Sequence, residues 1–189
     1  NIHVIIPGNG DAILLLSNNI EIFSSKNISV TISDLESIEI TMDKEKTYST
    51  LLKSGINIPK FFRINNYDEF LSSIKKLGYP KNDICFKPSK YSESGGSKGF
   101  RVLRNRNLAS NIILDFKPDS IEIDFETVKN MFNTGKKLDL LVMEYLPGDE
   151  FSTYVFANKG KMLYCIPNIR QNLSQHYSFE AKTVKNKEI

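Results

Sequence analysis

Residues 84–103 constrain the fold of this 189-residue chain more than any other stretch. They read ICFKPSKYSESGGSKGFRVL. The apolar residues 84–86 predict a strand that ends at Lys87, because Pro88 has no N–H group to donate to a sheet. A loop of small residues follows, and the apolar residues around Val102 resume an extended pattern. We therefore predict a strand, a glycine-rich loop and a second strand.

The glycine-rich loop is suited to binding an anion. Its small residues are Ser94, Gly95, Gly96, Ser97 and Gly99. Glycine has no Cβ, so such a backbone can approach a ligand closely and turn successive N–H groups towards it. Between residues 87 and 106, six basic side chains accompany one acidic side chain, and this positive field favours a polyphosphate. The alternative is a solvated hairpin whose glycines only form a turn.

The loop matches neither of two common phosphate-binding signatures. A P-loop requires a Gly-Lys-Ser/Thr sequence that leads into a helix, whereas Lys98 leads into a predicted strand. The dinucleotide fingerprint, Gly-x-Gly-x-x-Gly between a strand and a helix, is not found here either. A phosphate would therefore lie under a β-hairpin loop.

The composition is that of a globular protein. Hydrophobic residues make up 40% of the chain, enough for one domain or two small ones. The net charge of +3 is mild, and its basic residues gather near one loop, which argues against a dedicated nucleic-acid binder. Cys85 and Cys165 lie in apolar runs, so we expect buried thiols and a cytoplasmic location. No apolar run reaches the roughly 18 residues that a membrane span needs.

The N-terminal residues predict a β-α-β unit. Residues 2–6 and 28–32 have strand patterns, and Asp11 can cap a helix between them. Two such strands become parallel neighbours when a helix connects them. This unit is too small for a complete domain and looks like the end of one. The sequence begins at Asn1 without Met, and we expect it to be part of a longer protein.

Helix-capping residues mark the next elements. Asp43 predicts the start of a helix that runs through Lys53 and ends at Gly55. Residues 61–64 predict a short strand, and Asn66, followed three residues later by Glu, resembles a capping box.

The remaining pattern is mainly extended. We predict helices at 108–114 and after Asp124, and strands at 140–145, 150–157 and 162–166. Residues 140–145 are almost wholly apolar, which favours a central strand buried on both faces. After Ile169 the sequence pattern weakens.

Four separated pieces of sequence occur in the order and spacing of a known family. They are MDKEKT at 42–47 with SGINIP at 54–59, FKPS at 86–89 with SGGSKG at 94–99, MEYLPGDEFS at 143–152, and IPNIR at 166–170. Together they resemble the ATP-grasp superfamily, most closely its carbamoyl-phosphate-synthase-like ligase branch. The likeness covers residues 28–170.

The resemblance implies a site residue by residue. Lys44 and Lys87 match positions that contact the nucleotide phosphates; the alternatives are a lysine on a helix surface and one at a strand end. Ser94, Gly95, Gly96, Ser97 and Gly99 match the loop over the β- and γ-phosphates. Glu144, Tyr145 and Leu146 match the segment whose main chain meets the adenine edge, and Glu150 matches the carboxylate that binds the ribose hydroxyls.

Two residues are implied in the chemistry itself. Lys87 would act on the transferred phosphate, and Arg170 would hold an acyl phosphate or a substrate carboxylate through its planar fork. For Arg170 the alternative is a strand-end arginine in water, and for Glu150 it is a strand residue that faces solvent.

The fold that the resemblance implies is α+β, an incomplete two-lobe ATP-grasp fold with the nucleotide between the lobes. Residues 1–41 would be the tail of a preceding α/β domain, residues 42–146 the N-terminal lobe, and residues 147–189 the start of the C-terminal lobe. The expected activity is ATP-dependent ligation, in which a small carboxylate becomes an acyl phosphate that an amine or a similar nucleophile attacks. No nucleic-acid or membrane partner is expected.

Mg²⁺ is the expected metal, with no ligand in this chain. The family's metal-binding carboxylates follow later than residue 189, so we expect the fragment to be inactive alone and the parent protein to be an enzyme. Two other functions are considered: a module that binds or senses ATP without chemistry, and a nucleic-acid-binding fragment that uses the basic residues 87–106.

Overall fold

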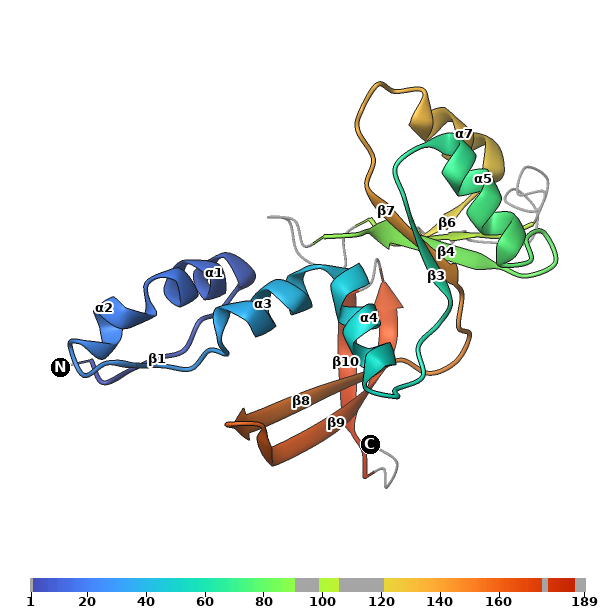
Figure 1. Cartoon of the computed structure of the whole chain (residues 1–189). Helices are drawn as coiled ribbons and strands as arrows, with labels where there is room; N and C mark the ends of the chain where they lie inside the picture. The colour runs from blue at the N-terminus through green and yellow to red at the C-terminus, as the bar shows by residue number, and fades with distance from the viewer. Residues whose placement is uncertain (1, 91–98, 106–120, 175–176, 186–189) are drawn as a thin grey trace.

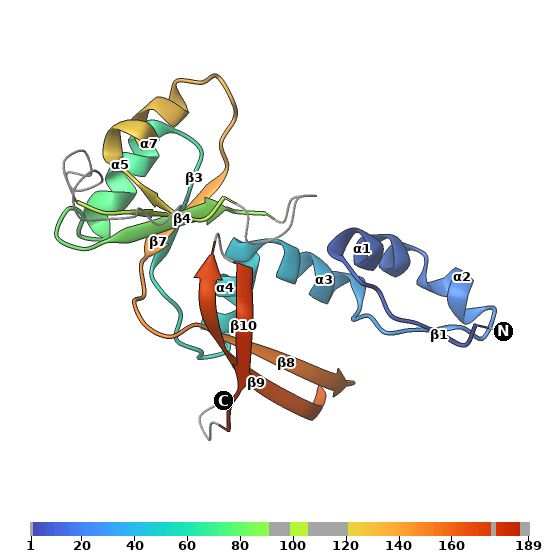
Figure 2. The ribbon, with the colours of Figure 1, turned by 180° about the vertical axis from the view of Figure 1, so that it is seen from behind.

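The computed structural model describes residues 2–90, 99–105, 121–174 and 177–185 (Figures 1 and 2). They form an N-terminal unit with a two-stranded sheet, a five-stranded mixed sheet with helices, and a three-stranded antiparallel sheet. The predicted α+β class is confirmed. The helix predicted at 108–114 lies outside the described residues.

The N-terminal unit is the predicted β-α-β arrangement. Its elements are β1 (Val4–Ile5), α1 (Gly10–Asn18), α2 (Ile20–Ser24) and β2 (Ser29–Val30). Strands β1 and β2 pair in parallel. The predicted cap at Asp11 is wrong: Asn9 has the extended backbone of an N-cap and accepts a hydrogen bond from Ala12 N–H at 2.8 Å, while Asp11 lies in the first turn.

Two helices follow and lead to the large sheet. They are α3 (Leu35–Met42) and α4 (Lys44–Lys53). Asp43 caps α4 as predicted, because its side chain accepts hydrogen bonds from Glu45 N–H and Lys46 N–H at 3.0 and 3.2 Å. The helix ends at a left-handed Gly55 with φ +77°, and Ile56 N–H donates to Leu51 O.

The five-stranded sheet has the order β3-β7-β4-β5-β6. Its strands are β3 (Phe61–Ile64), β4 (Ile84–Pro88), β5 (Arg101–Leu103), β6 (Glu122–Ile123) and β7 (Leu140–Glu144). Strand β7 lies between β3 and β4, antiparallel to both, and its first four residues are buried, which confirms the predicted central strand.

The first strand of the predicted strand–loop–strand unit is one residue longer than predicted. Strand β4 continues through Pro88, which lies opposite Leu140, and Ser89 N–H then donates to Asp139 O at 3.0 Å. Proline lacks only the donor, so it can occupy a position where the ladder does not require its N–H group. Strands β4 and β5 pair antiparallel, as a hairpin requires.

Helices α5 (Tyr67–Lys76) and α7 (Phe125–Phe132) cover one face of this sheet, and α4 lies on the other side (Figures 1 and 2). The core under α5 and α7 includes Phe70 and Phe86, whose ring centroids are 6.2 Å apart. On the opposite face Cys85, Val102 and Met143 form a smaller cluster with Tyr48 of α4 packed against it. Since side chains alternate along a strand, Lys87 lies on the same face as Cys85.

The three-stranded sheet has the order β10-β9-β8. It consists of β8 (Phe151–Asn158), β9 (Lys161–Ser174) and β10 (Tyr177–Thr183). The predicted β8–β9 hairpin is confirmed, with positive φ angles at Lys159 and Gly160 in its turn. After Ile169, where the sequence pattern weakens, β9 continues to Ser174 and pairs with β10. None of the helices in the described ranges is long and apolar enough to cross a membrane.

Candidate functional site

The candidate site lies on the face of the five-stranded sheet opposite α5 and α7. Arg63 of β3 and Lys87 of β4 are both in register with Leu141 of β7, the strand between them. The three side chains therefore form one row across the sheet, with the fully buried Leu141 between two cations. Neighbouring strands are about 4.8 Å apart, so two strand spacings separate the Arg63 and Lys87 backbones.

The N-terminus of α4 lies against the end of β4. Lys44 N–H donates to Ser89 O at 2.9 Å, and Asp43 forms an isolated antiparallel bridge with Lys90. These backbone contacts bring the start of α4, and with it the Lys44 side chain, next to the strand that bears Lys87. The predicted phosphate-binding lysines are thus neighbours in space although 43 positions separate them in the sequence.

Lys44 is in an unfavourable electrostatic environment. Burial lowers its pKa below the ordinary lysine value, the charge of Lys87 lowers it further, and Asp43 opposes both effects. Two ammonium groups that disfavour each other's charge would both be stabilised by a polyanion placed between them. Their roles as phosphate contacts remain predictions.

Tyr48 orients Lys87. The Lys87 Nζ donates to the Tyr48 hydroxyl at 3.0 Å and lies 5.3 Å from the centre of its ring, which combines a hydrogen bond with a cation–π contact. Tyr48 is one helical turn after Lys44, so both residues point from the same face of α4. The sequence motifs assigned Tyr48 no part in the site.

The thiol of Cys85 is unsuited to nucleophilic chemistry. Cys85 is buried beneath the same face, and burial raises the pKa of its thiol to about 11, an effect that Lys87 partly offsets. Its Sγ lies 3.4 Å from Glu144 O, as a weak donor. The expectation of a buried thiol is confirmed for Cys85 but is wrong for Cys165, which is only partly buried.

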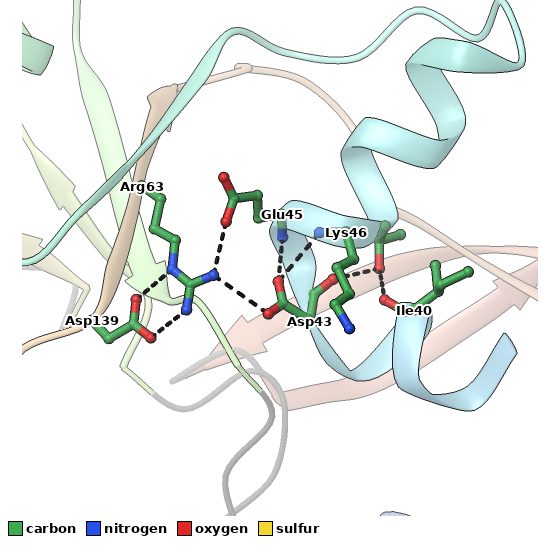
Figure 3. Close-up of polar contacts among 7 residues, drawn as sticks. Ile40, Asp43, Glu45, Lys46, Arg63 and Asp139 are labelled. Carbon is green, nitrogen blue, oxygen red and sulfur yellow. Dashed lines mark hydrogen bonds and ion pairs between the residues drawn. The ribbon is translucent and has the colours of Figure 1, made fainter. Parts of the chain in front are cut away.

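A four-residue ion-pair network links β3 to the start of α4, the helix turn that bears Lys44. Figure 3 shows its members, which are Arg63, Asp139, Asp43 and Glu45. Arg63 donates from Nε and Nη2 to the two carboxylate oxygens of Asp139, at 2.8 and 2.7 Å. Its Nη1 donates to Glu45 at 2.8 Å and lies 3.5 Å from Asp43 Oδ2. The Arg63 guanidinium holds the pKa of Asp139 below its ordinary value. Sequence reasoning missed this network, because no local pattern links residues 76 positions apart.

The predicted adenine-binding segment begins at the end of β7. Glu144 makes two hydrogen bonds with the main chain of Lys60. The Glu144 N–H donates to Lys60 O at 3.0 Å, and the Glu144 carboxylate accepts from Lys60 N–H at 2.9 Å. The Arg104 guanidinium lies over the Tyr145 ring, 5.5 Å from its centre, and Leu146 is largely exposed. The side chain of Glu144 thus fixes the strand end, and the part of residues 144–146 in binding adenine stays a prediction.

Glu150 and Arg170 form an ion pair. Arg170 Nη1 binds Glu150 Oε1, and Arg170 N–H donates to Glu150 O at 2.8 Å, so the contact joins the start of β8 to β9. The side chain of Glu150 is half exposed and that of Arg170 is largely buried. The two residues were predicted separately, one for ribose and one for the acid, and the structure brings them together.

The glycine-rich loop is described only at its end. Ser94, Gly95, Gly96 and Ser97 lie outside the described residues. Gly99 has φ +84°, and a Cβ there would lie 3.0 Å from both Cγ and Cδ of Pro88. The positive φ favours glycine at this position, and a Cβ there would require Pro88 to move by a few tenths of an ångström. Among the described residues no group of three or more His, Cys, Asp or Glu is placed to hold a metal ion.

No protein-family model matches the sequence, and neither does any curated protein sequence. Solved structures do match the fold. The D-alanine–D-alanine ligase of Bacillus anthracis complexed with ATP is 20% identical and has a TM-score of 0.50; the match covers 89% of this chain and 47% of that one. The VanG D-Ala:D-Ser ligase of Enterococcus faecalis is 16% identical with a TM-score of 0.56, covering 97% of this chain and 49% of the ligase.

The fold of the chain is also similar to that of a synthetase. The N5-carboxyaminoimidazole synthetase of Staphylococcus aureus complexed with ADP is 13% identical, with a TM-score of 0.55 and coverage of 95% of this chain and 40% of the synthetase. This chain therefore spans half or less of the length of the structures it matches. At these identities the likeness establishes the fold.

Proposed function

We propose that this chain, whose fold is an incomplete ATP-grasp fold, is the ATP-binding part of a ligase that activates a carboxylate as an acyl phosphate. An amine or a similar nucleophile would then attack the activated carbon. The observation that supports ATP binding is the closeness of Lys44 and Lys87 at the junction of α4 and β4. Similar structures were solved with ATP and ADP bound, which agrees with a nucleotide as the ligand.

In this proposal the two lysines bind the phosphates. Two ammonium groups held side by side stabilise a polyphosphate strongly, because each is a compact charge and one is partly removed from water. Tyr48 fixes the direction of the Lys87 ammonium and so reduces the entropy lost when the anion binds. Binding of the polyphosphate therefore offsets the repulsion between Lys44 and Lys87.

The nucleoside would lie against the main chain after β7. The adenine edge would use peptide groups of Glu144 to Leu146, and the ribose hydroxyls would donate to Glu150. A carboxylate accepts several hydrogen bonds, so Glu150 can keep Arg170 on one oxygen while it binds a hydroxyl. Arg170 thus has two proposed tasks, orienting Glu150 and binding the acid.

The proposed reaction has two steps. A carboxylate oxygen attacks the γ-phosphorus of ATP, the bond from that phosphorus to the bridging oxygen breaks, and ADP leaves. The nucleophile next attacks the acyl carbon, loses a proton and displaces inorganic phosphate. Lys87 neutralises charge on the transferred group, so the protein acts by positioning and electrostatics. The described residues do not by themselves fit a Mg²⁺ site, and we assign no step to a metal ion.

The finer assignments are part of the same proposal. We favour the carbamoyl-phosphate-synthase-like branch because of the combined motifs, and a cytoplasmic location because the buried Cys85 is a free thiol. The second candidate is a module that binds ATP without chemistry. It uses the same lysines and predicts nucleotide binding without ADP release in the parent protein.

Calorimetry with a non-hydrolysable ATP analogue tests the binding site. Replacing Lys44 or Lys87 by Ala should weaken binding by about tenfold or more, since each removes a charge-assisted hydrogen bond. Lys53→Ala is the matched control, because Lys53 is an exposed lysine at the other end of α4. Equal affinities for Lys44→Ala and Lys53→Ala would contradict the proposed site.

A second measurement separates ligation from simple binding. The parent protein is incubated with ATP, hydroxylamine and a set of small carboxylates that includes amino acids and bicarbonate. An acyl phosphate is trapped as a hydroxamate, with ADP released in equal amount. ATP binding without any ADP release across the set would favour the non-catalytic module.

A further inference from the structure

We propose that Arg63 is a positioning residue, which holds the first turn of α4 on the sheet so that Lys44 lies beside Lys87. The inference rests on the proposed function, because it concerns the same two lysines. It adds a residue that belongs to none of the sequence motifs and that lies two strands away from Lys87.

Arg63 joins three separate segments through one guanidinium group. Asp139 precedes β7 and occupies two donors, while Asp43 and Glu45 come from the cap and first turn of α4. The Asp43 side chain is almost completely buried, so its charge depends on these partners and on the helix N–H groups it caps. A planar fork with five donors can bind all three carboxylates in fixed directions.

Helix α4 depends on such polar contacts for its position. None of its residues is buried, in contrast to α5 and α7, which contribute Phe70 and Val128 to the main core. Its described apolar contacts with the sheet are made by Tyr48, which packs on Phe61, with ring centroids 5.3 Å apart, and against the small cluster around Cys85. The polar contacts between this helix and the sheet include the Arg63 ion pairs, the Lys44–Ser89 hydrogen bond and the Lys87–Tyr48 hydrogen bond.

The position of Arg63 affects the two lysines, because Arg63 and Lys87 both contact the helix that bears Lys44. Arg63 and Lys87 lie in one row across the sheet, on either side of Leu141. Arg63 binds Glu45 on one side of the α4 N-terminus, and Tyr48 on the same helix binds Lys87. A shift of α4 along or away from the sheet would therefore change the Lys44–Lys87 separation directly.

The local charges make this attachment necessary. The repulsion between Lys44 and Lys87 favours moving α4 away from β4, and Arg63 opposes that movement by binding the acidic groups of the same helix turn. Without the guanidinium, three neighbouring carboxylates would also repel one another. Arg63 thus stabilises an arrangement that is electrostatically unfavourable until an anion binds.

The test compares Arg63→Met with two reference variants. Arg63→Lys keeps the charge but loses the fork, and Lys129→Met removes one positive charge from an exposed position of α7, on the other face of the sheet. The probes are inorganic tripolyphosphate and adenosine, used separately, and the titration of Lys44 followed by NMR of its labelled side chain. Circular dichroism and urea unfolding report whether each variant is folded.

We expect Arg63→Met to weaken tripolyphosphate binding about tenfold, with adenosine binding unchanged. The pKa of Lys44 should rise towards its ordinary value, because Lys44 moves away from Lys87 into water. For both the tripolyphosphate affinity and the pKa of Lys44, Arg63→Lys should give values between those of Arg63→Met and the wild type. Lys129→Met should give the values of the wild type. A loss of both ligands together would indicate general damage to the fold and would overturn the positioning role.

The lysine titration keeps this inference separate from the proposed function. If the wild type binds no tripolyphosphate but the Lys44 titration moves in Arg63→Met, the proposed function fails and the role of Arg63 stands. If the wild type binds tripolyphosphate and Arg63→Met binds it equally, with Lys44 unchanged, the role of Arg63 is wrong. Should Arg63→Met not fold, Glu45→Gln breaks a single, partly exposed pair and should give the same changes at smaller size.

Discussion

At the scale of single residues, the site is defined by cations that are held together in the absence of an anion. Lys44 is the clearest case, since burial and a neighbouring ammonium group both disfavour its charge. Lys87 has a partner in Tyr48, which satisfies one of its three donors and leaves others for a ligand. The residue chemistry therefore favours binding of a polyphosphate and predicts how that binding responds to pH and to substitution.

The first prediction concerns the pH dependence of Lys44. A bound triphosphate favours the charged form, so affinity for an ATP analogue should fall as pH rises through the lowered pKa of Lys44, which lies below the ordinary lysine value. The Lys44→Met variant should bind more weakly and lose that part of the slope. Calorimetry at several pH values measures both, and identical slopes in the two proteins would contradict the prediction.

In the unliganded protein, a rise in pH should increase the free energy of unfolding, whereas it decreases the affinity for the ATP analogue. The folded-state pKa of Lys44 lies below the unfolded value, so the unfolded chain binds more protons between the two values. The contribution of Lys44 to the free energy of unfolding should therefore increase as pH rises through this window. Urea unfolding of the wild type and Lys44→Met over the same range detects the difference.

The second prediction separates the two contacts of Tyr48. Tyr48→Phe keeps the ring under Lys87 and removes the hydrogen bond, whereas Tyr48→Leu removes both. We expect losses in ATP-analogue binding of about 1 kcal/mol for Phe and about 2 kcal/mol for Leu. Tyr154→Phe is the control, because Tyr154 is 68% exposed on β8. Equal affinities for Tyr48→Leu and Tyr154→Phe would show that Tyr48 has no part in binding.

At the scale of elements, capping residues were the most informative part of the sequence. Asp43, Asn66 and Asp124 each accept the N–H hydrogen bonds that the capping rules require. Such signals act over three residues and so can be read from the chain alone. The error at Asp11 has the same origin, because Asn9, two positions earlier, can make the same type of bond and does so.

Sheet edges were harder to predict, because they depend on distant partners. Strand β10 forms by pairing with β9, so its residues need no strong strand pattern of their own. Pro88 lies opposite Leu140, a pairing between residues 52 positions apart. Local propensity describes neither case, since the register of the partner strand decides which residues are paired.

The third prediction tests one cap. Asn66 accepts a hydrogen bond from Glu69 N–H at 2.9 Å, and Glu69 in return accepts from Asn65 N–H at 2.7 Å. Asn66→Ala should lower the free energy of unfolding by about 1 kcal/mol. Asn66→Asp should keep most of the stabilisation that the cap supplies. Because α5 covers the face opposite the lysines, ATP-analogue affinity should stay unchanged. A loss of affinity in folded Asn66→Ala would show that the two faces are coupled.

At the scale of the whole molecule, the sequence motifs identified the candidate residues but not their arrangement. Lys44 and Lys87 were named from separate motifs, and their proximity depends on the contact between α4 and β4. Arg63 and Asp139 belong to no motif, because an ion pair across 76 positions leaves no periodic signal in a single sequence. The pairing of Glu150 with Arg170 also needed the β8–β9 register.

The fourth prediction follows from the uneven distribution of buried residues. Most buried apolar side chains belong to the five-stranded sheet and its helices, whereas β8 has no buried residue along its length. Backbone amides in β4 and β7 should therefore exchange with solvent most slowly, at rates that approach global unfolding. Amides in β8 and in β1 should exchange through local opening, at least about a hundredfold faster.

Hydrogen exchange with and without the ATP analogue extends this prediction to function. A ligand held by Lys44, Lys87 and Glu150 contacts both sheets, so it should slow exchange at the start of β8 and in the first turn of α4 together. Ligand stabilises only those states that retain its contacts, so β1 should be unaffected. Slowing confined to β4 and α4 would restrict the bound nucleotide to the five-stranded sheet and remove Glu150 from the site. Uniformly slow exchange in β7, β8 and β1 without ligand would instead mean that the three sheets unfold as one unit.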